Sequence, residues 1–379
     1  MERAERPVVA IDTTPLVTMR TGIGHSVEGM WTALRDMPAG PVLIPYVLGL
    51  RPPSRLPGTS QAPVNIRFPT RLLLATWSRA RWPSIDRWLG GADVVHATNF
   101  VTAPSRLPTL VTVHDIGFVI DPSTANRVVG RFGPILRRAI SRGVHIHVTT
   151  HQVASEIEEH FGAGLVAEGR VHVVPFGVPP LGEPGPLPPG IESAIAGREY
   201  ILAIGTAERR KNLPRLIAAF GKLAAERPTI VLVLAGAPGP DSPAVEAAVR
   251  ALPPAVSSRV LLVGVVGGGA RRTLLDGATV LAYPSLYEGF GFPPLEAMQC
   301  GVPVVASNRG AVREVAGPAA QLIEPTDVDD LAAGLQRLVD DPQERESLIE
   351  RGKRHVSGFT WERTAAGLLQ IYRDLAASR

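Results

Sequence analysis

The fold is decided by the stretch Tyr283-Pro-Ser-Leu-Tyr-Glu288-Gly-Phe-Gly-Phe-Pro-Pro-Leu-Glu296-Ala-Met298. The apolar run before it, Thr279 to Tyr283, predicts a buried strand. Two consecutive prolines suit the first turn of a helix, where a missing N–H costs little, and Gly301 suits the position just past the end of that helix. The stretch therefore places Glu288 on the loop after a strand and Glu296 in the first turn of the following helix.

The loop between the two glutamates has two interpretations. Gly289 and Gly291 leave backbone N–H groups open to a ligand, and a carboxylate at each end of an amide-lined loop can hold a polyhydroxylated, anionic ligand. The alternative is a tight strand-to-helix connection with two surface carboxylates. The loop alone leaves both interpretations open.

A family resemblance favours the first interpretation. The segment Glu288-Gly-Phe-Gly-Phe-Pro-Pro-Leu-Glu296-Ala-Met-Gln-Cys-Gly-Val-Pro-Val-Val-Ala-Ser307 resembles the donor-site signature of retaining family 4 glycosyltransferases, in which seven residues separate two glutamates. The resemblance is tight in the second half of the chain and loose in the first, and it is strongest to a mannosyltransferase-like subgroup. It implies the GT-B fold, with two Rossmann-like α/β/α domains facing each other across a cleft.

The order of the predicted elements agrees with this fold. Strands alternate with helices in both halves, which predicts two α/β domains with mainly parallel sheets. A proline-rich segment, 179–190, predicts a stiff linker. We predict an acceptor-side domain over 1–183, a donor domain over 198–360, and a C-terminal helix, about 362–379, that packs back on the first domain.

Composition limits the functional classes. The 379 residues are 45% hydrophobic, with a formal net charge of +4 and one cysteine, Cys300. This supports two packed cores and permits no internal disulfide, as expected for a reducing cytoplasm. No apolar run has the length of a membrane span, the N-terminus lacks the features of a secretory signal, and no nucleic-acid-binding module is legible. We expect a cytoplasmic protein without a nucleic-acid partner.

The basic excess lies in the first half, largely between Arg51 and Arg87. Within it, the segment from Arg67 to Leu89 holds five arginines, one aspartate, and Trp77, Trp82 and Trp88. Such a segment suits the inner face of an anionic membrane or a lipid-linked acceptor. The alternative is that the tryptophans pack into the domain while the arginines form a solvated face, and both interpretations stay open.

Two further features of the first half are candidates for the site. We predict that Gly22, Ile23 and Gly24 form a loop before a helix from Val27, where an anion could bind; a flexible loop is the alternative. His114 follows the predicted strand Thr109 to Val113, at the sheet edge where α/β proteins collect ligands. The resemblance implies that the glycine loop lies beside the donor phosphate and that His114 lies near the donor sugar.

The second half supplies cations. Arg210 and Lys211 follow the predicted strand Tyr200 to Gly205, and Asn212 is expected to cap the next helix. Cations beside a helix N-terminus form a diphosphate site in physical terms; a solvated basic turn is the alternative. The resemblance assigns both cations to the donor diphosphate, with Thr206 where some members carry arginine.

The resemblance also implies the reaction. A hexosyl group, mannosyl favoured, moves with retained configuration from a nucleotide-diphosphate sugar to a hydroxyl, without metal or cofactor. The donor resembles GDP-mannose, with UDP- or dTDP-sugars as alternatives, and the acceptor is a glycan, a lipid-linked sugar or a natural product. A non-catalytic sugar-nucleotide binder and a GT-B epimerase are the alternative functions.

Each candidate residue has an implied role. Glu296 accepts hydrogen bonds from the ribose, Glu288 holds the donor sugar, and His114 positions or polarises that sugar. Val265 lies near the nucleobase, but Gly267 to Ala270 depart from the polar residues usual there, so the sequence does not reveal the base. The predicted donor site also includes Gly289, Phe290, Gly291, Phe292 and Leu295.

Overall fold

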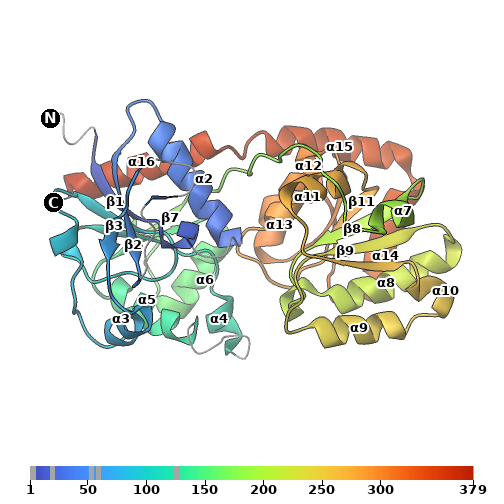
Figure 1. Ribbon diagram of the computed structural model, residues 1–379, viewed down its shortest axis with the longest axis horizontal. Coiled ribbons are helices and arrows are strands. Elements are labelled where there is room, and N and C mark those ends of the chain that lie inside the picture. The colour runs from blue at the N-terminus through green and yellow to red at the C-terminus, as the bar shows by residue number, and fades with distance from the viewer. Residues whose placement is uncertain (1–5, 18–21, 51–54, 57–60, 123–128, 379) are drawn as a thin grey trace. The chain divides into compact units, whose positions relative to one another are not determined.

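The computed structural model describes residues 6–17, 22–50, 55–56, 61–122 and 129–378. The chain forms two compact units, one of Met1–Gly177 with Phe359–Arg379 and one of Val178–Gly358 (Figure 1). Thr21, beside the predicted glycine loop, and Arg51, at the start of the predicted basic region, lie outside the described residues.

Unit 1 is built on a parallel seven-stranded sheet of order β3-β2-β1-β4-β5-β6-β7. Its strands are β1 (Val8–Asp12), β2 (Val42–Leu48), β3 (Val64–Ile66), β4 (Val94–Ala97), β5 (Thr109–Thr112), β6 (His145–Val148) and β7 (Val171–Val173). Its helices are α2 (Gly22–Asp36), α3 (Thr70–Trp77), α4 (Gly117–Ile120), α5 (Phe132–Ile140), α6 (His151–Phe161) and α16 (Trp361–Ala377). Among them, α3, α5 and α6 pack their apolar sides into two buried clusters with the strands.

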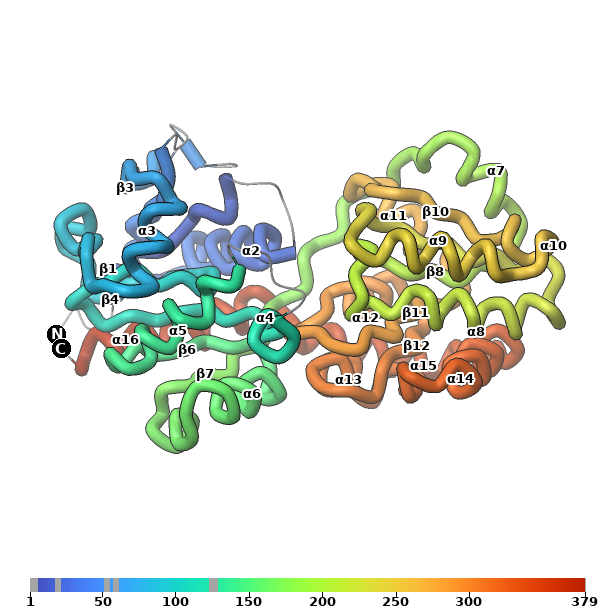
Figure 2. Tube along the Cα trace, turned by 90° about the horizontal axis from the view of Figure 1, so that it is seen from below, coloured from blue at the N-terminus to red at the C-terminus, as the bar shows by residue number. Residues whose placement is uncertain are grey.

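Unit 2 is built on a parallel six-stranded sheet of order β10-β9-β8-β11-β12-β13. Its strands are β8 (Tyr200–Ile204), β9 (Val231–Ala235), β10 (Val260–Gly264), β11 (Val280–Tyr283), β12 (Val304–Ser307) and β13 (Gln321–Ile323). Its helices are α7 (Ile191–Ile195), α8 (Leu213–Glu226), α9 (Ser242–Arg250), α10 (Pro254–Ser257), α11 (Gly268–Asp276), α12 (Phe292–Gln299), α13 (Gly310–Ala316), α14 (Val328–Asp340) and α15 (Pro342–Val356). Helices α8 and α9 lie side by side (Figure 2), and α14 packs against α8. The predicted α/β/α architecture is confirmed in both units.

The C-terminal helix α16 belongs to unit 1, where it packs against α2. Close backbone approach makes this contact, because a Cβ added at Gly29 would lie 2.2 Å from the indole ring of Trp361. A Cβ at Gly177 would lie 2.3 Å from the backbone nitrogen of Trp361. A side chain at position 29 would therefore have to move the Trp361 ring, and one at position 177 would have to move the backbone at the start of α16.

A buried polar chain joins α16 to the sheet of unit 1. Tyr372 Oη lies 2.7 Å from His96 Nδ1, His96 Nε2 lies 2.8 Å from Thr112 Oγ1, and that oxygen lies 2.9 Å from His147 Nδ1. His147 Nε2 lies 2.9 Å from the Val174 carbonyl, which can only accept. Every proton is thereby assigned: Tyr372 donates to His96, His96 to Thr112, Thr112 to His147, and His147 to the carbonyl. Both imidazoles must be neutral to complete the chain.

The structure corrects two expectations for unit 1 and, for Trp77, decides between two interpretations that the sequence leaves open. Gly22, Ile23 and Gly24 form the first turn of α2 rather than a loop before it. The prolines before Arg67 predict a loop over that stretch, but it contains strand β3, which is too short to show a period. Trp77 is 1% exposed and donates from Nε1 to the Pro83 carbonyl at 3.1 Å, so it cannot insert into a lipid interface. None of the helices among the described residues combines the length and apolarity needed to span a bilayer.

The buried histidines predict acid-sensitive stability. Burial lowers the pKa of His114 and His147 to about 4, against 6.5 for the free side chain. Between these values the unfolded chain binds more protons, so the free energy of unfolding falls as the pH drops from about 6.5 to about 4. Each histidine contributes up to roughly 3 kcal/mol. Urea unfolding followed by near-UV circular dichroism should show a lower midpoint at pH 5 than at pH 7.

Asp12 provides the control for this prediction. Burial raises the pKa of Asp12 to about 6 from 3.8, so this carboxyl costs stability above pH 4 and opposes the histidines below pH 6. Asp12→Asn should therefore make the loss of stability steeper between pH 6 and pH 4. Equal urea midpoints at pH 7 and pH 5 in the Asn variant would contradict the assignment of neutral histidines.

Candidate active site

The candidate site of unit 2 lies where the strand order of its sheet reverses, between β8 and β11. The connections from β8 and β11 leave toward opposite edges of the sheet, although the two strands are neighbours. Such a switch point opens a crevice at the carboxyl ends of the strands. The loop after β8 carries Arg210 and Lys211, and the loop after β11 carries Glu288. The sheet order therefore brings together residues that are far apart in the sequence.

Glu288 joins both cations. Its Oε1 lies 2.5 Å from Lys211 Nζ, and its Oε2 accepts a hydrogen bond from Arg210 Nη1. Lys211 also donates to Tyr283 Oη at 3.0 Å, and Arg210 Nε lies 2.7 Å from Glu208. The Glu288 side chain is 8% exposed, whereas that of Arg210 is 39% exposed. Three of the predicted site residues therefore lie in contact, together with Tyr283 and Glu208, which had no distinctive signal in the sequence.

The pKa shifts show which effect dominates in this cluster. Burial would raise the pKa of Glu288, but the charges of Lys211 and Arg210 outweigh it and hold that pKa below its usual value. Burial lowers the pKa of Lys211, and the neighbouring Glu288 opposes this shift. The carboxylate is therefore ionised at neutral pH because two cations are fixed beside it.

Asn212 connects the two loops in a way that differs from the prediction. It precedes α8 as expected, but its side chain makes no capping hydrogen bond. Its backbone is left-handed, with φ 59° and ψ 29°, and its Nδ2 donates to the carbonyls of Pro284 at 3.0 Å and Pro325 at 2.6 Å. Leu286 N also donates to the Arg210 carbonyl at 2.7 Å. The side chain and backbone together hold the cationic loop against the loop of Glu288.

Glu296 lies on α12, just after the first turn of the helix, in which it was predicted to lie. The helix begins at Phe292 after Gly291, whose φ of 94° favours glycine, and its first turn contains proline, as predicted. Glu296 is 7% exposed and accepts a hydrogen bond from Arg271 Nη2 on α11. Sequence analysis missed Arg271, although it is the first side chain after the run Val265–Ala270 that can form hydrogen bonds.

The remaining predicted residues of unit 2 take different positions. Thr206 lies on the loop after β8, and Val265 is 73% exposed just after β10. Leu295 is fully buried, so its side chain belongs to the core, and Phe290 packs against Phe292 with ring centroids 5.3 Å apart. These positions do not test the predicted contacts with a donor.

His114 is the candidate of unit 1. It follows β5, packs between the rings of Phe100 and Phe176, and places Nε2 2.9 Å from the Thr98 carbonyl. A carbonyl only accepts, so Nε2 carries the proton and Nδ1 is left as an acceptor. Because burial lowers the pKa of His114 to about 4, the ring is neutral at pH 7. It can accept a hydrogen bond from a hydroxyl, but it cannot act as a cation.

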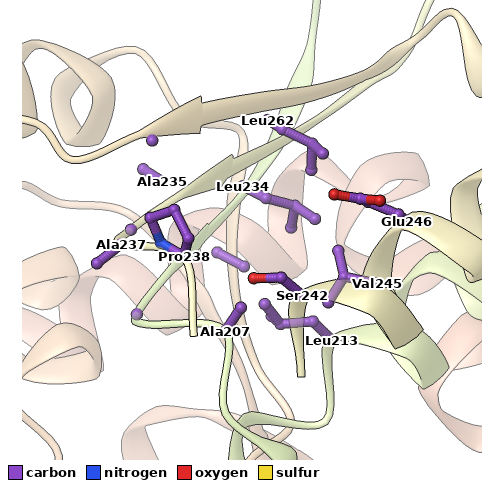
Figure 3. A pocket seen from close by; sticks show the side chains of 14 residues that line it. Ala207, Leu213, Leu234, Ala235, Ala237, Pro238, Ser242, Val245, Glu246 and Leu262 are labelled. Atoms are coloured by element: carbon purple, nitrogen blue, oxygen red, sulfur yellow. The ribbon is translucent and has the colours of Figure 1, made fainter. Parts of the chain in front are cut away.

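An apolar cavity of about 240 Å³ lies under the ends of β8, β9 and β10 (Figure 3). It is lined by Leu213, Leu234, Val245 and Leu262, with alanines and glycines between them. Glu246 is the one ionisable side chain among its lining residues. None of Arg210, Lys211, Glu288 or Glu296 lines the cavity, but Lys211 lies near its lining residue Gly205, where an added Cβ would be 3.1 Å from Lys211 Cε.

Comparison with solved structures defines the class of fold. Sucrose-phosphate synthase from Thermosynechococcus elongatus superposes with a TM-score of 0.75 over 99% of this chain and 100% of that chain, at 21% identity. A UDP-forming α,α-trehalose-phosphate synthase from Burkholderia vietnamiensis gives 0.66 over 99% and 100%, at 12% identity. These likenesses show that the protein has the GT-B fold of two Rossmann-like domains.

Comparison of sequences then gives the family. The model of "Glycosyl transferases group 1" matches residues 191–355, and that of "Glycosyltransferase Family 4" matches residues 42–180. An MMP α-(1→4)-mannosyltransferase from Mycolicibacterium hassiacum is 36% identical over 86% of this chain and 83% of its own length. O-antigen chain mannosyltransferase B from Escherichia coli is 36% identical over 48% of this chain and 47% of its own length. The chain therefore belongs to the family of GT-B glycosyltransferases.

The charged cluster predicts how Glu288 affects stability. Glu288→Gln removes the carboxylate that pairs with both Arg210 and Lys211, leaving a buried ammonium beside a guanidinium. Removing one partner of a buried ion pair costs about 3–5 kcal/mol. The variant should have a lower melting temperature than the wild type. Millimolar pyrophosphate should raise the melting temperature of the variant by more than it raises that of the wild type. Glu226→Gln, which removes an exposed carboxylate on α8, should leave the melting temperature unchanged. A Glu288→Gln variant as stable as the wild type, with no gain from pyrophosphate, would contradict the cluster as an anion site.

Proposed function

We propose that this glycosyltransferase moves a hexosyl group, most favourably mannosyl, from a nucleotide-diphosphate sugar to an acceptor hydroxyl with retained configuration. The observation that carries the proposal is the cluster of Arg210, Lys211 and Glu288 at the switch point. The names of the mannosyltransferases from M. hassiacum and E. coli support the choice of sugar. Family membership favours transfer over the alternatives of a non-catalytic binder or an epimerase.

The chemical demand of the reaction is a leaving nucleotide diphosphate that gains negative charge. Preorganised cations stabilise such charge without reorganising at the moment of reaction. Lys211 is 11% exposed and held by Glu288 and Tyr283, so its ammonium is already in place. Arg210 is the more exposed of the two and lies on the same loop. We assign both to the diphosphate, in the role that a metal ion has in other transferases.

Two carboxylates of unit 2 and one imidazole of unit 1 have proposed roles toward the donor. Glu296 accepts from the ribose hydroxyls of the donor, and Glu288, beside the two cations, contacts the sugar that is transferred. The neutral ring of His114 accepts a hydrogen bond from a hydroxyl at Nδ1, which supports a positioning role rather than a polarising one. We propose a GDP-mannose-like donor, with UDP- and dTDP-sugars as the donors to compare.

The acceptor is proposed as a hydroxyl on a carbohydrate-like molecule. The M. hassiacum relative is named a mannosyltransferase, and a relative from Rhodococcus opacus, 27% identical over 77% of this chain and 64% of its own length, is named a D-inositol 3-phosphate glycosyltransferase. Both names support a polyhydroxylated acceptor. A free glycan, a lipid-linked sugar and a natural product are the acceptors to compare in the assay.

The basic segment of unit 1 supports peripheral association with an anionic membrane. Trp82 is 68% exposed and Leu72 is 59% exposed, beside the exposed side chains of Arg71, Arg79 and Arg81. No ion pair among the described residues involves these three arginines, whereas most ion pairs described lie in unit 2. We therefore propose that Trp82 and Leu72 enter the lipid interface while the arginines meet its phosphates.

The proposed function predicts metal-independent transfer that depends on Lys211. Sugar transfer from the preferred donor should persist in excess chelator, because fixed cations stabilise the leaving group. Lys211→Ala and Arg210→Ala should each slow transfer by about 100- to 1,000-fold, the effect of removing one such charge donor. Lys222→Ala, which removes a surface lysine paired with Asp329, is the matched control and should retain activity. Chelator-induced loss that magnesium restores, or full activity in both variants, would refute the assignment.

The membrane surface predicts salt-sensitive binding to vesicles. The wild type should sediment with anionic phosphatidylglycerol liposomes at low salt, since each basic residue near such a surface contributes about 1 kcal/mol. Arg71→Glu/Arg79→Glu/Arg81→Glu should stay in the supernatant. The matched variant Arg250→Glu/Arg313→Glu/Arg354→Glu changes the net charge equally on unit 2 and should still sediment. If the wild type remains soluble beside these vesicles, the segment is ordinary surface.

A further inference from the structure

Arg271 forms a contact that the rest of the donor site does not explain. Its Nη2 donates to Oε2 of Glu296, the carboxylate that we assign to the ribose. The Glu296 side chain is 9% exposed and that of Arg271 is 27% exposed, so the pair is largely shielded from water. Among the hydrogen bonds of the described residues, none involves Oε1 of Glu296. One oxygen of the carboxylate is therefore fixed by the arginine while the other stays available.

The pair is poorly explained as a device for stability. The Nε–H of Arg271 is buried and has no hydrogen-bond partner among the described residues. Leaving a buried donor unmatched costs free energy, and native structures rarely keep one without a reason. Burying an ion pair also costs desolvation that an apolar pair would avoid. A leucine or methionine at position 271 would pack there without these costs, which indicates that the guanidinium has another role.

The position of Arg271 is rigidly defined. Thr273, on the same helix, donates from Oγ1 to the Gly185 carbonyl at 2.7 Å and accepts from Gly185 N at 3.0 Å. Gly185 N also donates to the Gly269 carbonyl at 3.0 Å, and a Cβ at Gly269 would lie 3.1 Å from the Cα of Gly185. The segment of unit 2 that contains Gly185 is thus fixed to the N-terminal turns of α11. A helix held in this way presents Arg271 to Glu296 in one geometry.

The loop before α11 and the first residues of that helix have no side chain that could form a hydrogen bond with Glu296 in place of Arg271. The six residues from Val265 to Ala270 are valines, glycines and alanine, so none of their side chains can form a hydrogen bond. Arg272, the next residue, turns to Asp276 on its own helix, at 2.7 Å. Arg271 is therefore the polar side chain of this region that reaches the predicted nucleoside site.

We infer that Arg271 is a positioning residue for ribose recognition. It holds Oε2 of Glu296, so that Oε1 is aimed at the 2′- and 3′-hydroxyls of the donor nucleoside. This inference rests on the proposed function, because it takes Glu296 to be the ribose ligand. Discrimination between ribose and 2′-deoxyribose nucleotides is then set by the pair rather than by Glu296 alone.

The test is a ratio of two dissociation constants measured by calorimetry. The tightest of GDP, UDP and ADP is titrated alongside its 2′-deoxy analogue. The wild type should prefer the ribonucleotide by about tenfold or more, the effect of a hydrogen bond to a charged group. Arg271→Met should abolish most of this preference, and Arg271→Lys should restore part of it, since lysine keeps the charge without the planar fork. The unfolding temperature of each variant checks that unit 2 stays folded.

Two further variants keep the inference separate from the function on which it rests. Arg272→Met makes the same change one residue away and should keep the wild-type ratio. Glu296→Gln should lose the preference, and the double variant with Arg271→Met should lose no more than either single one. If Glu296→Gln loses the preference but Arg271→Met keeps it, Arg271 is not a positioning residue. If Glu296→Gln itself keeps the preference, the assignment of Glu296 to ribose fails instead.

Discussion

Everything in the candidate site depends on one carboxylate shared by two cations. Without Glu288, the charges of Arg210 and Lys211 would repel each other, and the burial of Lys211 would strengthen that repulsion. With Glu288 in place, burial lowers the lysine pKa less, and the carboxylate stays ionised. The pair of cations can then be kept close together before any ligand arrives, which is the arrangement that a diphosphate requires. The same contact joins the loop after β8 to the loop after β11. One carboxylate therefore both holds the two loops together and fixes the two cations.

Backbone geometry makes that contact possible. A Cβ at Gly236 would lie 1.9 Å from the Gly205 carbonyl oxygen, so the loops after β8 and β9 approach more closely than any side chain permits. Asn212 takes a left-handed conformation that a branched residue would resist, and it uses its amide to reach two carbonyls. Such local strain is offset by the hydrogen bonds it allows. The cationic loop is therefore fixed from both sides before the charges themselves are considered.

The sequence predicted what depends on local pattern and missed what depends on packing. Apolar runs such as Thr109 to Val113 and Tyr200 to Gly205 and the prolines of α12 identified their elements, because buried parallel strands and helix starts have strong local signals. The meeting of Glu288 with Arg210 and Lys211 was predicted only through the family resemblance. Strand β3 was not predicted because three residues are too few to show a period. The first turn of α2 was predicted as a loop because of its glycines. The pairing of Arg271 with Glu296 joins side chains of two different helices, α11 and α12, and no local sequence pattern indicates such a contact.

Charge is distributed differently in the two units, and the difference follows from what each must hold. In unit 2 the arginines and lysines largely face carboxylates of the same unit, so the field at the switch point is set by a few fixed groups. In unit 1, Arg142 just after α5 lies near two other arginines: its pKa is lowered first by burial and then by the charges of Arg81, which follows α3, and Arg138 on α5. Uncompensated repulsion of this kind costs stability. A surface that keeps it is better suited to an anionic partner than to water alone, whereas unit 2 offers its ligand two cations that are already neutralised in part and fixed in place.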